Sequence, residues 1–354
     1  MNSEFQYREK IPVAILGATG AVGQRFVELL AIHPWFEIVS LAASERSVGK
    51  PYREAVNWLM ASPLPQNLAE MVIEPCRPGI GGVLAFSALD SSVATEVEQA
   101  FEKAGVMVVS NTRNHRMEPM VPLLIPEVNA DHIDPLLKAS VGARKIITNP
   151  NCSAIGLCVA LKPLFDQFGL EAVNVVTMQA ISGAGYPGIA SLDIVDNVIP
   201  YISGEEEKLE TEPLKIFGKA GHQGIEPASF AISAHCNRVA VTDGHTASVS
   251  VKLKKRARPE EILHAWQTFT TVAQELQLPM APRSPICYFE EERFPQPKLH
   301  RHLEKGMAIA IGRLRPCPLF DYKFTILSHN TIRGAAGGAI LCAELLVRKG
   351  HIFW

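Results

Sequence analysis

The sequence predicts an α/β protein with two domains. Over the first 150 residues, short apolar strand-like runs alternate with helix-like segments, which is typical of a parallel sheet joined by helical crossovers. A glycine-rich turn follows the first of these strands. After Cys152 the apolar segments become longer and partly alternating, as expected of a sheet with one covered face.

The first half of the chain is predicted to contain strands at 11–16, 37–43, 83–86 and 106–110 and helices at 22–32 and 93–103. In the second half, strands are expected at 172–181 and 246–253, with glycine-rich and acidic stretches between them. The proline-rich segment 278–299 is expected to be an extended arm or loop, and the chain turns helical again near its end.

The composition is that of a globular protein. The 354 residues are 47% hydrophobic and carry a formal net charge of −2, so neither nucleic acid nor an anionic membrane is an expected partner. Seven scattered cysteines without a C-x-x-C pair argue against disulfides or a metal site and fit a reducing compartment. The first residues are too polar for a signal peptide, and no apolar run approaches the roughly 20 residues that span a bilayer, so we expect a cytoplasmic protein.

Gly17, Gly20 and Gly23 lie between the first predicted strand and the first helix, in the string V-A-I-L-G-A-T-G-A-V-G-Q-R-F. Glycines at this place allow a tight turn and let a diphosphate approach the helix N-terminus, as in Rossmann-type dinucleotide domains. The spacing is G-x-x-G-x-x-G and not the standard G-x-G-x-x-G, and glycines that serve only turn and packing are the alternative.

The second strand ends in A-A-S-E-R-S, where a dinucleotide domain contacts the adenine ribose. Ser44, Arg46 and Ser47 supply hydroxyl groups and a cation for a 2′-phosphate, which favours NADP. Glu45 lies among them and is the residue type that binds the free ribose of NAD, unless it faces solvent.

Cys152, in N-P-N-C-S-A-I-G, is placed where a helix is predicted to begin. The unpaired N–H groups and dipole of a helix N-terminus lower the pKa of a thiol and favour the reactive thiolate. Cys158 lies inside the apolar stretch that follows and is expected in the core. A structural cysteine is the more common case, but the position just after a dinucleotide domain favours a nucleophile.

A cysteine beside a nicotinamide indicates aldehyde chemistry, which needs an acid/base and groups that bind anions. Arg238 and His245 in N-R-V-A-V-T-D-G-H-T are candidates. If Asp243 and Gly244 form a two-residue hairpin turn, both side chains point to one face; a single continuous strand would put them on opposite faces. The spacing leaves both arrangements open.

Several motifs together resemble the aspartate-semialdehyde dehydrogenase family, in the branch typical of archaea and fungi. They run in order over nearly the whole chain: G-A-T-G-A-V-G-Q-R-F, S-N-T-R-N-H-R-M, P-N-C-S, Q-A-I-S-G-A-G-Y-P-G, G-I-E-P-A-S-F-A-I-S-A-H-C-N-R-V-A-V-T-D-G-H-T and L-S-H-N-T-I-R-G-A-A-G. The resemblance implies NADPH-dependent reductive dephosphorylation of L-aspartyl 4-phosphate to L-aspartate 4-semialdehyde, through a thioester on Cys152.

The resemblance also implies a role for each matching residue. The catalytic residues are Cys152, His245 and Gln179; the substrate and its phosphate contact Arg238, Glu212, Lys215, Arg116 and Asn111; the cofactor contacts Gly17, Thr19, Gly20, Ala21, Val22, Ser44, Arg46, Ser47, Ser87, Ser182, Gly183 and Asn330. Arg113 competes with Arg116 for its role. Glu212 and Lys215 also have the spacing of an ordinary helical ion pair, and Pro213 between them makes their register the weakest match.

By the same resemblance, residues 1–151 and 332–354 form the NADP-binding domain, and 152–331 form an α+β catalytic and dimerisation domain with a mixed sheet. The last helix, about 332–350, is expected to pack on the NADP-binding domain, and the chain is expected to form a homodimer or homotetramer. The alternatives are an acyl-CoA reductase, such as one acting on malonyl-CoA, and a non-catalytic NADP-binding module. Glu212 and Arg238 favour an amino-acid substrate over an acyl-CoA, and the presence of Cys152 and His245 argues against a non-catalytic module.

Overall fold

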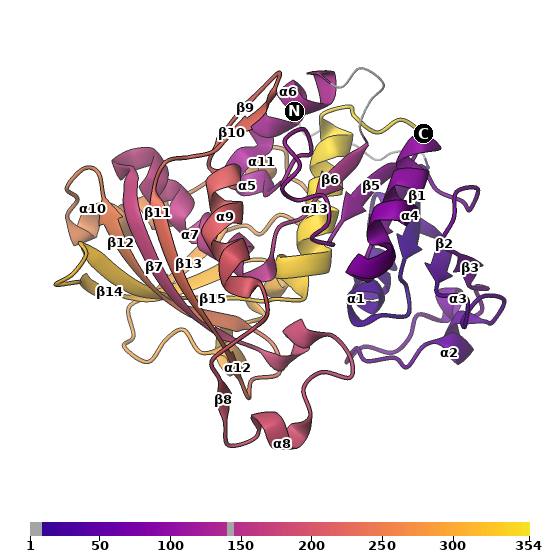
Figure 1. Ribbon diagram of the computed structural model, residues 1–354, viewed down its shortest axis with the longest axis horizontal. Coiled ribbons are helices and arrows are strands. Elements are labelled where there is room, and N and C mark those ends of the chain that lie inside the picture. Colours follow the sequence, from indigo (N-terminus) through magenta and orange to yellow (C-terminus); the bar gives the residue numbers. More distant parts are fainter. Residues whose placement is uncertain (1–8, 140–144) are drawn as a thin grey trace.

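The protein contains two large sheets that lie side by side, with the last helix between them (Figure 1). The structure is a computed structural model and describes residues 9–139 and 145–354. The described helices include none that is long and apolar enough to cross a membrane.

The first sheet has six parallel strands in the order β3-β2-β1-β4-β5-β6. They are β1 (Ile11–Leu16), β2 (Phe36–Ala43), β3 (Glu74–Pro75), β4 (Leu84–Ser87), β5 (Met107–Ser110) and β6 (Ile146–Thr148). The strand order reverses between β1 and β4, and a crevice at such a switch point is where open α/β sheets bind ligands. All four strands predicted in the first half are present, as β1, β2, β4 and β5, with ends shifted by one residue at most.

Helices surround this sheet in the alternation that the sequence predicts. They are α1 (Ala21–Leu30), α2 (Tyr52–Ala55), α3 (Gln66–Ala69), α4 (Ser91–Lys103), α5 (Pro126–Asn129) and α6 (Ile133–Ala139). The apolar spacing of α1 turns Phe26, Val27 and Leu30 towards the sheet, where all three are buried.

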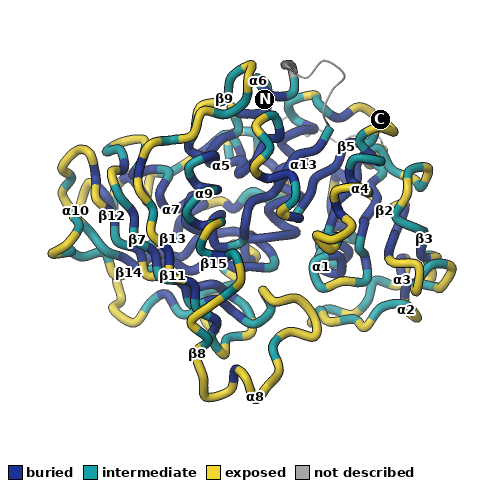
Figure 2. Tube along the Cα trace, viewed as in Figure 1, coloured by how far each residue is buried: buried dark blue, intermediate teal, exposed yellow. Residues whose placement is uncertain are grey.

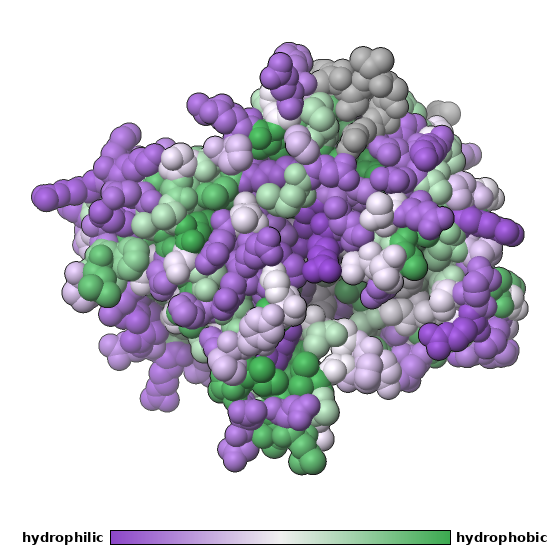
Figure 3. Space-filling view, in the orientation of Figure 1, coloured by the Kyte–Doolittle hydropathy of each residue, from purple (hydrophilic) through white to green (hydrophobic). Residues whose placement is uncertain are grey.

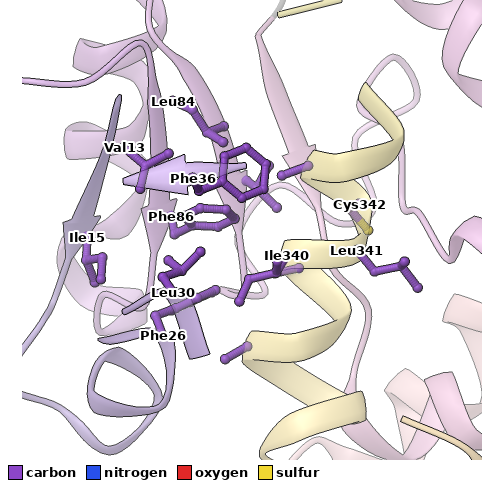
Figure 4. Close-up of a cluster of buried hydrophobic side chains, with 14 of the residues drawn as sticks. Val13, Ile15, Phe26, Leu30, Phe36, Leu84, Phe86, Ile340, Leu341 and Cys342 are labelled. Atoms are coloured by element: carbon purple, nitrogen blue, oxygen red, sulfur yellow. The ribbon is translucent and has the colours of Figure 1, made fainter. Parts of the chain in front are cut away.

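The C-terminal helix α13 (Gly337–Arg348) packs into the core of the first sheet. Ile340 points towards Phe26, Leu30 and Phe86 (Figure 4). The helix lies between the two sheets, and nearly every one of its residues is buried. This explains why its sequence is apolar on nearly all sides. The last helix thus packs on the first sheet, far from it in sequence. A five-residue π-helical turn, Ile332–Ala336, precedes it.

The second sheet is mixed and has the strand order β13-β14-β15-β12-β7-β11-β8. Its strands are β7 (Leu170–Gln179), β8 (Val198–Ile199), β11 (Ala231–Val239), β12 (His245–Leu253), β13 (Ile286–Phe289), β14 (Ile309–Pro316) and β15 (Tyr322–Ser328). Strands β9 (Lys219–Gly221) and β10 (Gly224–Glu226) form a separate small pair.

Helices α7 (Cys152–Phe168), α9 (Glu205–Ile216) and α10 (Pro259–Gln267) bury apolar side chains against the second sheet in one continuous core. The shorter α8 (Ser191–Ile194), α11 (Val272–Glu275) and α12 (Pro297–His300) lie in connections. The buried residues follow the strands of both sheets and helix α13 (Figure 2).

Three parts of the second half differ from the sequence-based expectation. Strands β11 and β12 form neither a hairpin nor one long strand, because β7 lies between them and pairs with both. The acidic stretch after 203, expected from the sequence only as a connection between strands, forms helix α9. This helix carries buried apolar side chains, Leu209 and Ile216, as well as its charged ones. The segment 278–299 contains β13 and the beginning of α12, and Leu278 packs into the core of the first sheet.

The segment around α8 projects from the molecule and is exposed (Figures 1 and 2). Apolar side chains gather over it (Figure 3). Within residues 191–201, the most exposed apolar side chains are Leu192, Tyr201, Val195 and Val198, with exposed fractions of 93%, 66%, 64% and 56%. So many apolar side chains on one projecting segment are typical of a surface that another protein chain covers.

Candidate active site

A cavity of about 670 Å³ brings together residues from both halves of the chain. Its wall contains the start of α1, the loop after β5, the start of α7, the ends of β7 and β11, the start of α9 and the π-helical turn. Ten of the predicted site residues line it: Ala21, Val22, Asn111, Arg116, Cys152, Gln179, Ser182, Gly183, Arg238 and Asn330.

Cys152 is the first residue of α7, as the sequence predicts. The side chain of Asn151 caps the helix and accepts hydrogen bonds from the N–H groups of Ser153 and Ala154, at 2.9 and 3.2 Å. Gly334 of the π-helical turn lies directly against Cys152, because a Cβ atom at this position would be only 2.6 Å from the cysteine Cβ. The sulfur is thus held between a helix N-terminus and a turn that only glycine allows.

The Sγ atom of Cys152 lies 3.2 Å from Nε2 of His245, although the two residues are 93 positions apart in the sequence. The other ring nitrogen of His245, Nδ1, accepts a hydrogen bond of 3.0 Å from the N–H group of Ala180. Burial is the main cause that lowers the pKa of His245 to about 3, so the ring is neutral at physiological pH.

The strand order of the second sheet brings three of the predicted residues into one row. Arg238 on β11 pairs with Gln179 on β7, and the pairing of Thr246 with Met178 puts His245 beside Gln179 from the opposite strand. Neighbouring residues on paired strands point to the same face. Arg238 and His245 therefore share a face, as the hairpin alternative also required, but for a different reason.

Gly183 closes over this row. A Cβ atom on Gly183 would lie 2.8 Å from Nη1 of Arg238 and 3.1 Å from Cε1 of His245, so a side chain here would displace one of the two. Nη1 of Arg238 also donates a hydrogen bond to the carbonyl oxygen of Ala180 at 2.7 Å. Asn330 is held by two hydrogen bonds: its Oδ1 accepts from the N–H of Gly244 and its Nδ2 donates to Ser182.

Helix α9 contributes Glu205 and Lys208 to the cavity, and neither was predicted. The carboxylate of Glu205 accepts hydrogen bonds from the side chains of Asn151 and Lys208, at 2.8 and 3.0 Å. Burial alone would raise the pKa of Glu205, but the Lys208 ammonium and hydrogen bonds from Asn151, Lys208 and Gln179 together lower it. Glu205 is therefore a carboxylate at neutral pH.

Glu212 and Lys215, predicted to contact the substrate, do not line the cavity. The carboxylate of Glu212 accepts from Arg116 at 2.9 Å and from the N–H of Asn151 at 2.6 Å. The ammonium of Lys215 donates to the carbonyl oxygens of Arg116, Glu118 and Val121 at 2.5 to 2.9 Å. Burial lowers the pKa of Lys215 to about 8. Glu212 and Lys215 therefore hold the loop after β5 through buried contacts outside the cavity.

The pair that lines the cavity, Glu205 and Lys208, lies seven residues before the predicted pair, Glu212 and Lys215, on the same helix. Residues seven apart are two turns apart and lie on nearly the same face of an α-helix. Glu205 and Lys208 occupy the turns of this face that line the cavity, and Glu212 and Lys215 occupy turns buried outside it. The sequence repeats the spacing E-x-x-K at both places, so spacing alone could not choose between them.

The charged residues that line the cavity among those described are the cations Arg113, Arg116, Lys208 and Arg238 and the single carboxylate Glu205. Such a surface attracts a ligand with more than one negative charge. Burial, followed by Glu205, raises the pKa of the Cys152 thiol to about 12, while Arg116, Arg238 and Lys208 lower it. The expected effect of the helix start is thus outweighed by desolvation in this structure.

A second cavity of about 490 Å³ lies at the switch point of the first sheet. The predicted residues Gly17, Thr19, Gly20 and Ser44 line it, together with Glu45 and Arg77. Arg46 and Ser47 do not line it, and Ser87, the last residue of β4, is buried and does not line it either. The cation on this wall is therefore Arg77, which follows β3 and is distant in sequence from the predicted S-E-R-S turn.

The glycine turn fits a dinucleotide diphosphate. A Cβ atom on Gly17 would be 2.6 Å from the carbonyl oxygen of Ala88, and one on Gly23 would be 2.1 Å from the carbonyl oxygen of Gly17. Helix α1 has no side-chain cap and no acidic residue in its first turn, so its N–H groups face the cavity edge without a competing anion.

Models of two protein domains match most of the chain. Residues 12–136 match the NAD binding domain of semialdehyde dehydrogenase, and residues 161–333 match the semialdehyde dehydrogenase dimerisation domain.

Aspartate-semialdehyde dehydrogenases from other organisms are similar to the chain over nearly its whole length, in sequence and in structure. The aspartate-semialdehyde dehydrogenase of Cryptococcus neoformans var. neoformans is 44% identical and that of Archaeoglobus fulgidus 46%, covering 98% and 95% of this chain and 99% and 98% of the relatives. The crystal structure of the Candida albicans enzyme with NADP is 41% identical over 97% of this chain and all of its own, with a TM-score of 0.91. That of Vibrio cholerae aspartate semialdehyde dehydrogenase II complexed with ASA is 28% identical over 97% of this chain and 99% of its own, with a TM-score of 0.76.

The chain belongs to the aspartate-semialdehyde dehydrogenase family. The resemblance in sequence motifs is thereby confirmed, as is the α/β fold with a parallel and a mixed sheet. The two cavities also contain functional candidates that the motifs did not indicate: Glu205 and Lys208 line the first cavity, and Arg77 lines the second. Their only sequence signals are the first E-x-x-K repeat of α9 and isolated cations in loops.

Two glycines of the α1 turn allow a matched test of the dinucleotide site. In Gly20→Ala the new Cβ has its nearest neighbour at 3.5 Å, an ordinary contact, so we expect an unchanged melting temperature. The methyl group would stand where a diphosphate approaches, and the KM for NADP should rise about tenfold, equivalent to roughly 1.4 kcal/mol. Gly23→Ala should instead destabilise the protein by about 1–3 kcal/mol or more through overpacking. Equal effects of both changes on KM and melting temperature would contradict this division.

Proposed function

We propose that the chain catalyses the NADP(H)-dependent interconversion of L-aspartyl 4-phosphate and L-aspartate 4-semialdehyde through a thioester on Cys152. The observation that carries this proposal is the contact of 3.2 Å between Sγ of Cys152 and Nε2 of His245, in a cavity whose wall is rich in cations. The comparisons favour this function over an acyl-CoA reductase and over a non-catalytic module.

Arg238 and Glu205 are the groups that we propose for the amino-acid end of the substrate. A guanidinium suits a planar carboxylate, because its N–H groups form a fork that matches the two oxygens. Arg238 lies beside Gln179 in the cavity wall. Glu205, as the one carboxylate among the described residues of the wall, is suited to a substrate ammonium group. It takes the role that the sequence assigned to Glu212.

Lys208, Arg116 and Asn111 are the groups that we propose for the phosphate, with Arg113 at the exposed edge of the wall. The side-chain amide nitrogen of Asn111 and Nε of Arg116 are both buried, and neither has a hydrogen-bond partner among the described residues. Unsatisfied buried donors are costly, so two of them beside one cavity indicate an anionic ligand. Lys208 takes the role that the sequence assigned to Lys215.

The glycine turn, α1 and the second cavity would hold the dinucleotide, with Ser182 and Asn330 at its nicotinamide end. The bound cofactor supplies the hydride in the reductive direction. Cys152 forms the bond to the substrate carbonyl carbon. We further propose that residues 1–151 and 332–354 form the NADP-binding domain and 152–331 the catalytic domain, which limited proteolysis would test. A cytoplasmic location, favoured by seven free cysteines, can be tested by cell fractionation.

Two cysteines of helix α7 give a direct test of the nucleophile. Cys152→Ala should abolish NADP reduction in the presence of aspartate semialdehyde and phosphate while NADPH binding is retained, because the sulfur that forms the thioester is lost. Cys158→Ala should retain turnover and only lower the melting temperature, because Cys158 is fully buried in the core. Turnover by the Cys152 variant, or activity of the wild type only with malonyl-CoA and NADPH, would refute the proposal.

The two lysines of α9 separate phosphate binding from support of the loop. Lys208→Met should raise the KM for phosphate by about ten- to hundredfold, the value of one hydrogen bond between charged groups. Lys215→Met should leave that KM unchanged, because its ammonium contacts three carbonyl oxygens outside the cavity. It should lower the free energy of unfolding by about 1–3 kcal/mol instead, since those oxygens lose their donor. The reverse pattern would restore the assignment to Lys215.

We propose that the exposed apolar segment around α8 contributes to a homodimer, which agrees with the match to a dimerisation domain. The double change Leu192→Glu and Val195→Glu should then yield a monomer in analytical ultracentrifugation, because it places two charges in an apolar contact. Leu319→Glu, at an equally exposed leucine elsewhere, is the control and should leave the oligomer intact. A wild-type monomer, or an unchanged oligomer in the double variant, would contradict this. Whether dimers pair into tetramers is read from the same experiment.

A further inference from the structure

All four carbonyl oxygens of the glycine turn 17–20 accept hydrogen bonds. The first and the last accept from the main chain. Gly17 accepts from the N–H of Gly20 at 3.1 Å, and Gly20 accepts from the N–H of Gln24 at 2.8 Å, which is the first i→i−4 bond of α1. The carbonyl groups of the two residues in between accept from buried side chains instead, and these side chains come from different parts of the chain.

Tyr52, the first residue of α2, donates its hydroxyl proton to the carbonyl oxygen of Ala18 at 2.9 Å. The two residues are both fully buried and 34 positions apart, and the tyrosine ring packs edge-on against Trp58. Burial raises the pKa of the Tyr52 phenol, so the hydroxyl keeps the proton that it donates. Ala18 is also held on its other side, because its N–H donates to the carbonyl oxygen of Ala42 at 2.9 Å.

Gln24 of α1 holds the next carbonyl group of the turn. Its Nε2 donates to the carbonyl oxygens of Thr19 at 2.9 Å and Asn57 at 3.0 Å, and its Oε1 accepts from the N–H of Leu59 at 2.7 Å. These bonds use both N–H groups and the oxygen of the amide, so the amide cannot turn over without losing all three. Because Gln24 is buried, water cannot replace the lost contacts.

The direction of these two carbonyl groups decides what the turn presents to an anion. In a trans peptide the N–H group of one residue points away from the carbonyl group of the residue before it. The carbonyl group of Ala18 is directed at buried Tyr52, so the N–H of Thr19 points to the opposite side, and Thr19 lines the second cavity. A carbonyl oxygen carries partial negative charge, and a peptide turned over at this place would set one against a diphosphate.

We propose that Tyr52 and Gln24 are positioning residues for the dinucleotide. They hold the carbonyl groups of Ala18 and Thr19 away from the diphosphate, so that the turn presents N–H groups to it. This inference rests on the proposed binding of the cofactor at the glycine turn. Neither side chain is among the described residues that line the first or the second cavity, so both act on the cofactor through the turn.

Tyr52→Phe removes one hydroxyl group and keeps the buried ring. The Kd for NADP, measured by isothermal titration calorimetry without substrate, should rise about three- to tenfold, the net value of one hydrogen bond between neutral groups. The Kd for adenosine 2′-monophosphate, which has no diphosphate, should not change. Tyr322→Phe is the matched control, because the Tyr322 hydroxyl donates to the carbonyl oxygen of Ala257 at 2.6 Å and lines neither cavity. It should lower the melting temperature as Tyr52→Phe does and leave both Kd values unchanged.

Gln24→Met removes the three hydrogen bonds of the amide and keeps the length of the side chain. The Kd for NADP should again rise by about tenfold, with that for adenosine 2′-monophosphate unchanged. In turnover assays both variants should raise the KM for NADP and retain kcat, because neither residue contacts the reacting groups. An equal loss of affinity for the two ligands, or an effect of Tyr322→Phe on NADP as large as that of Tyr52→Phe, would overturn the proposal. If Gln24→Met does not fold, the two tyrosine variants still decide.

Binding by Gly20→Ala separates this proposal from the proposed cofactor site. If Gly20→Ala leaves the Kd for NADP unchanged, the placement of the diphosphate at the glycine turn fails. If Gly20→Ala weakens NADP binding while Tyr52→Phe and Gln24→Met do not, the cofactor site stands and only the positioning role of the two side chains fails. Both results are obtained from binding alone, so they hold whether or not the wild type reduces NADP with aspartate semialdehyde and phosphate.

Discussion

The start of helix α7 is held by two carboxylates from helix α9, and the geometry of the cavity depends on this contact. Glu212 accepts from the backbone N–H of Asn151, and Glu205 accepts from its side-chain amide. Removing one partner from a buried charged contact is costly, because the remaining charge is left without compensation. The residue before the nucleophile is thus fixed from both sides, and Cys152 is placed by its neighbour as much as by its own packing.

The charges around the sulfur oppose one another. The helix N-terminus and the cations of the wall stabilise a thiolate, while burial and the nearby carboxylate of Glu205 stabilise the thiol. An anionic ligand that neutralises the cations would make a thiolate less stable, unless a neutral donor faces the sulfur. His245 contacts the sulfur without adding charge, because its ring is buried and neutral, and a neutral imidazole has one N–H group to donate. This is a physical reason for a histidine rather than a lysine at that place.

Local patterns were predicted well because their causes are local. The glycine turn before α1, strands β1, β2, β4 and β5 of the first sheet and the start of α7 at Cys152 each follow from a few neighbouring residues. That Arg238 lines the cavity and that His245 contacts Cys152 could be predicted only through the family resemblance. Their common face depends on β7, which enters between their strands from an earlier part of the sequence. The register of α9 failed for a related reason, since two turns of one helix face carry the same charge spacing.

By itself, the sequence determined that a dinucleotide turn and a helix-start cysteine belong to one chain of the aspartate-semialdehyde dehydrogenase family. Short-range steric and hydrogen-bonding preferences are sufficient for such motifs. Only the tertiary structure decided which turn of α9 faces the cavity, that Arg77 rather than Arg46 reaches the second cavity, and that the ring of His245 contacts both Cys152 and Ala180. Each of these depends on a partner that is far away in sequence, and the position of that partner results from the packing of the whole fold.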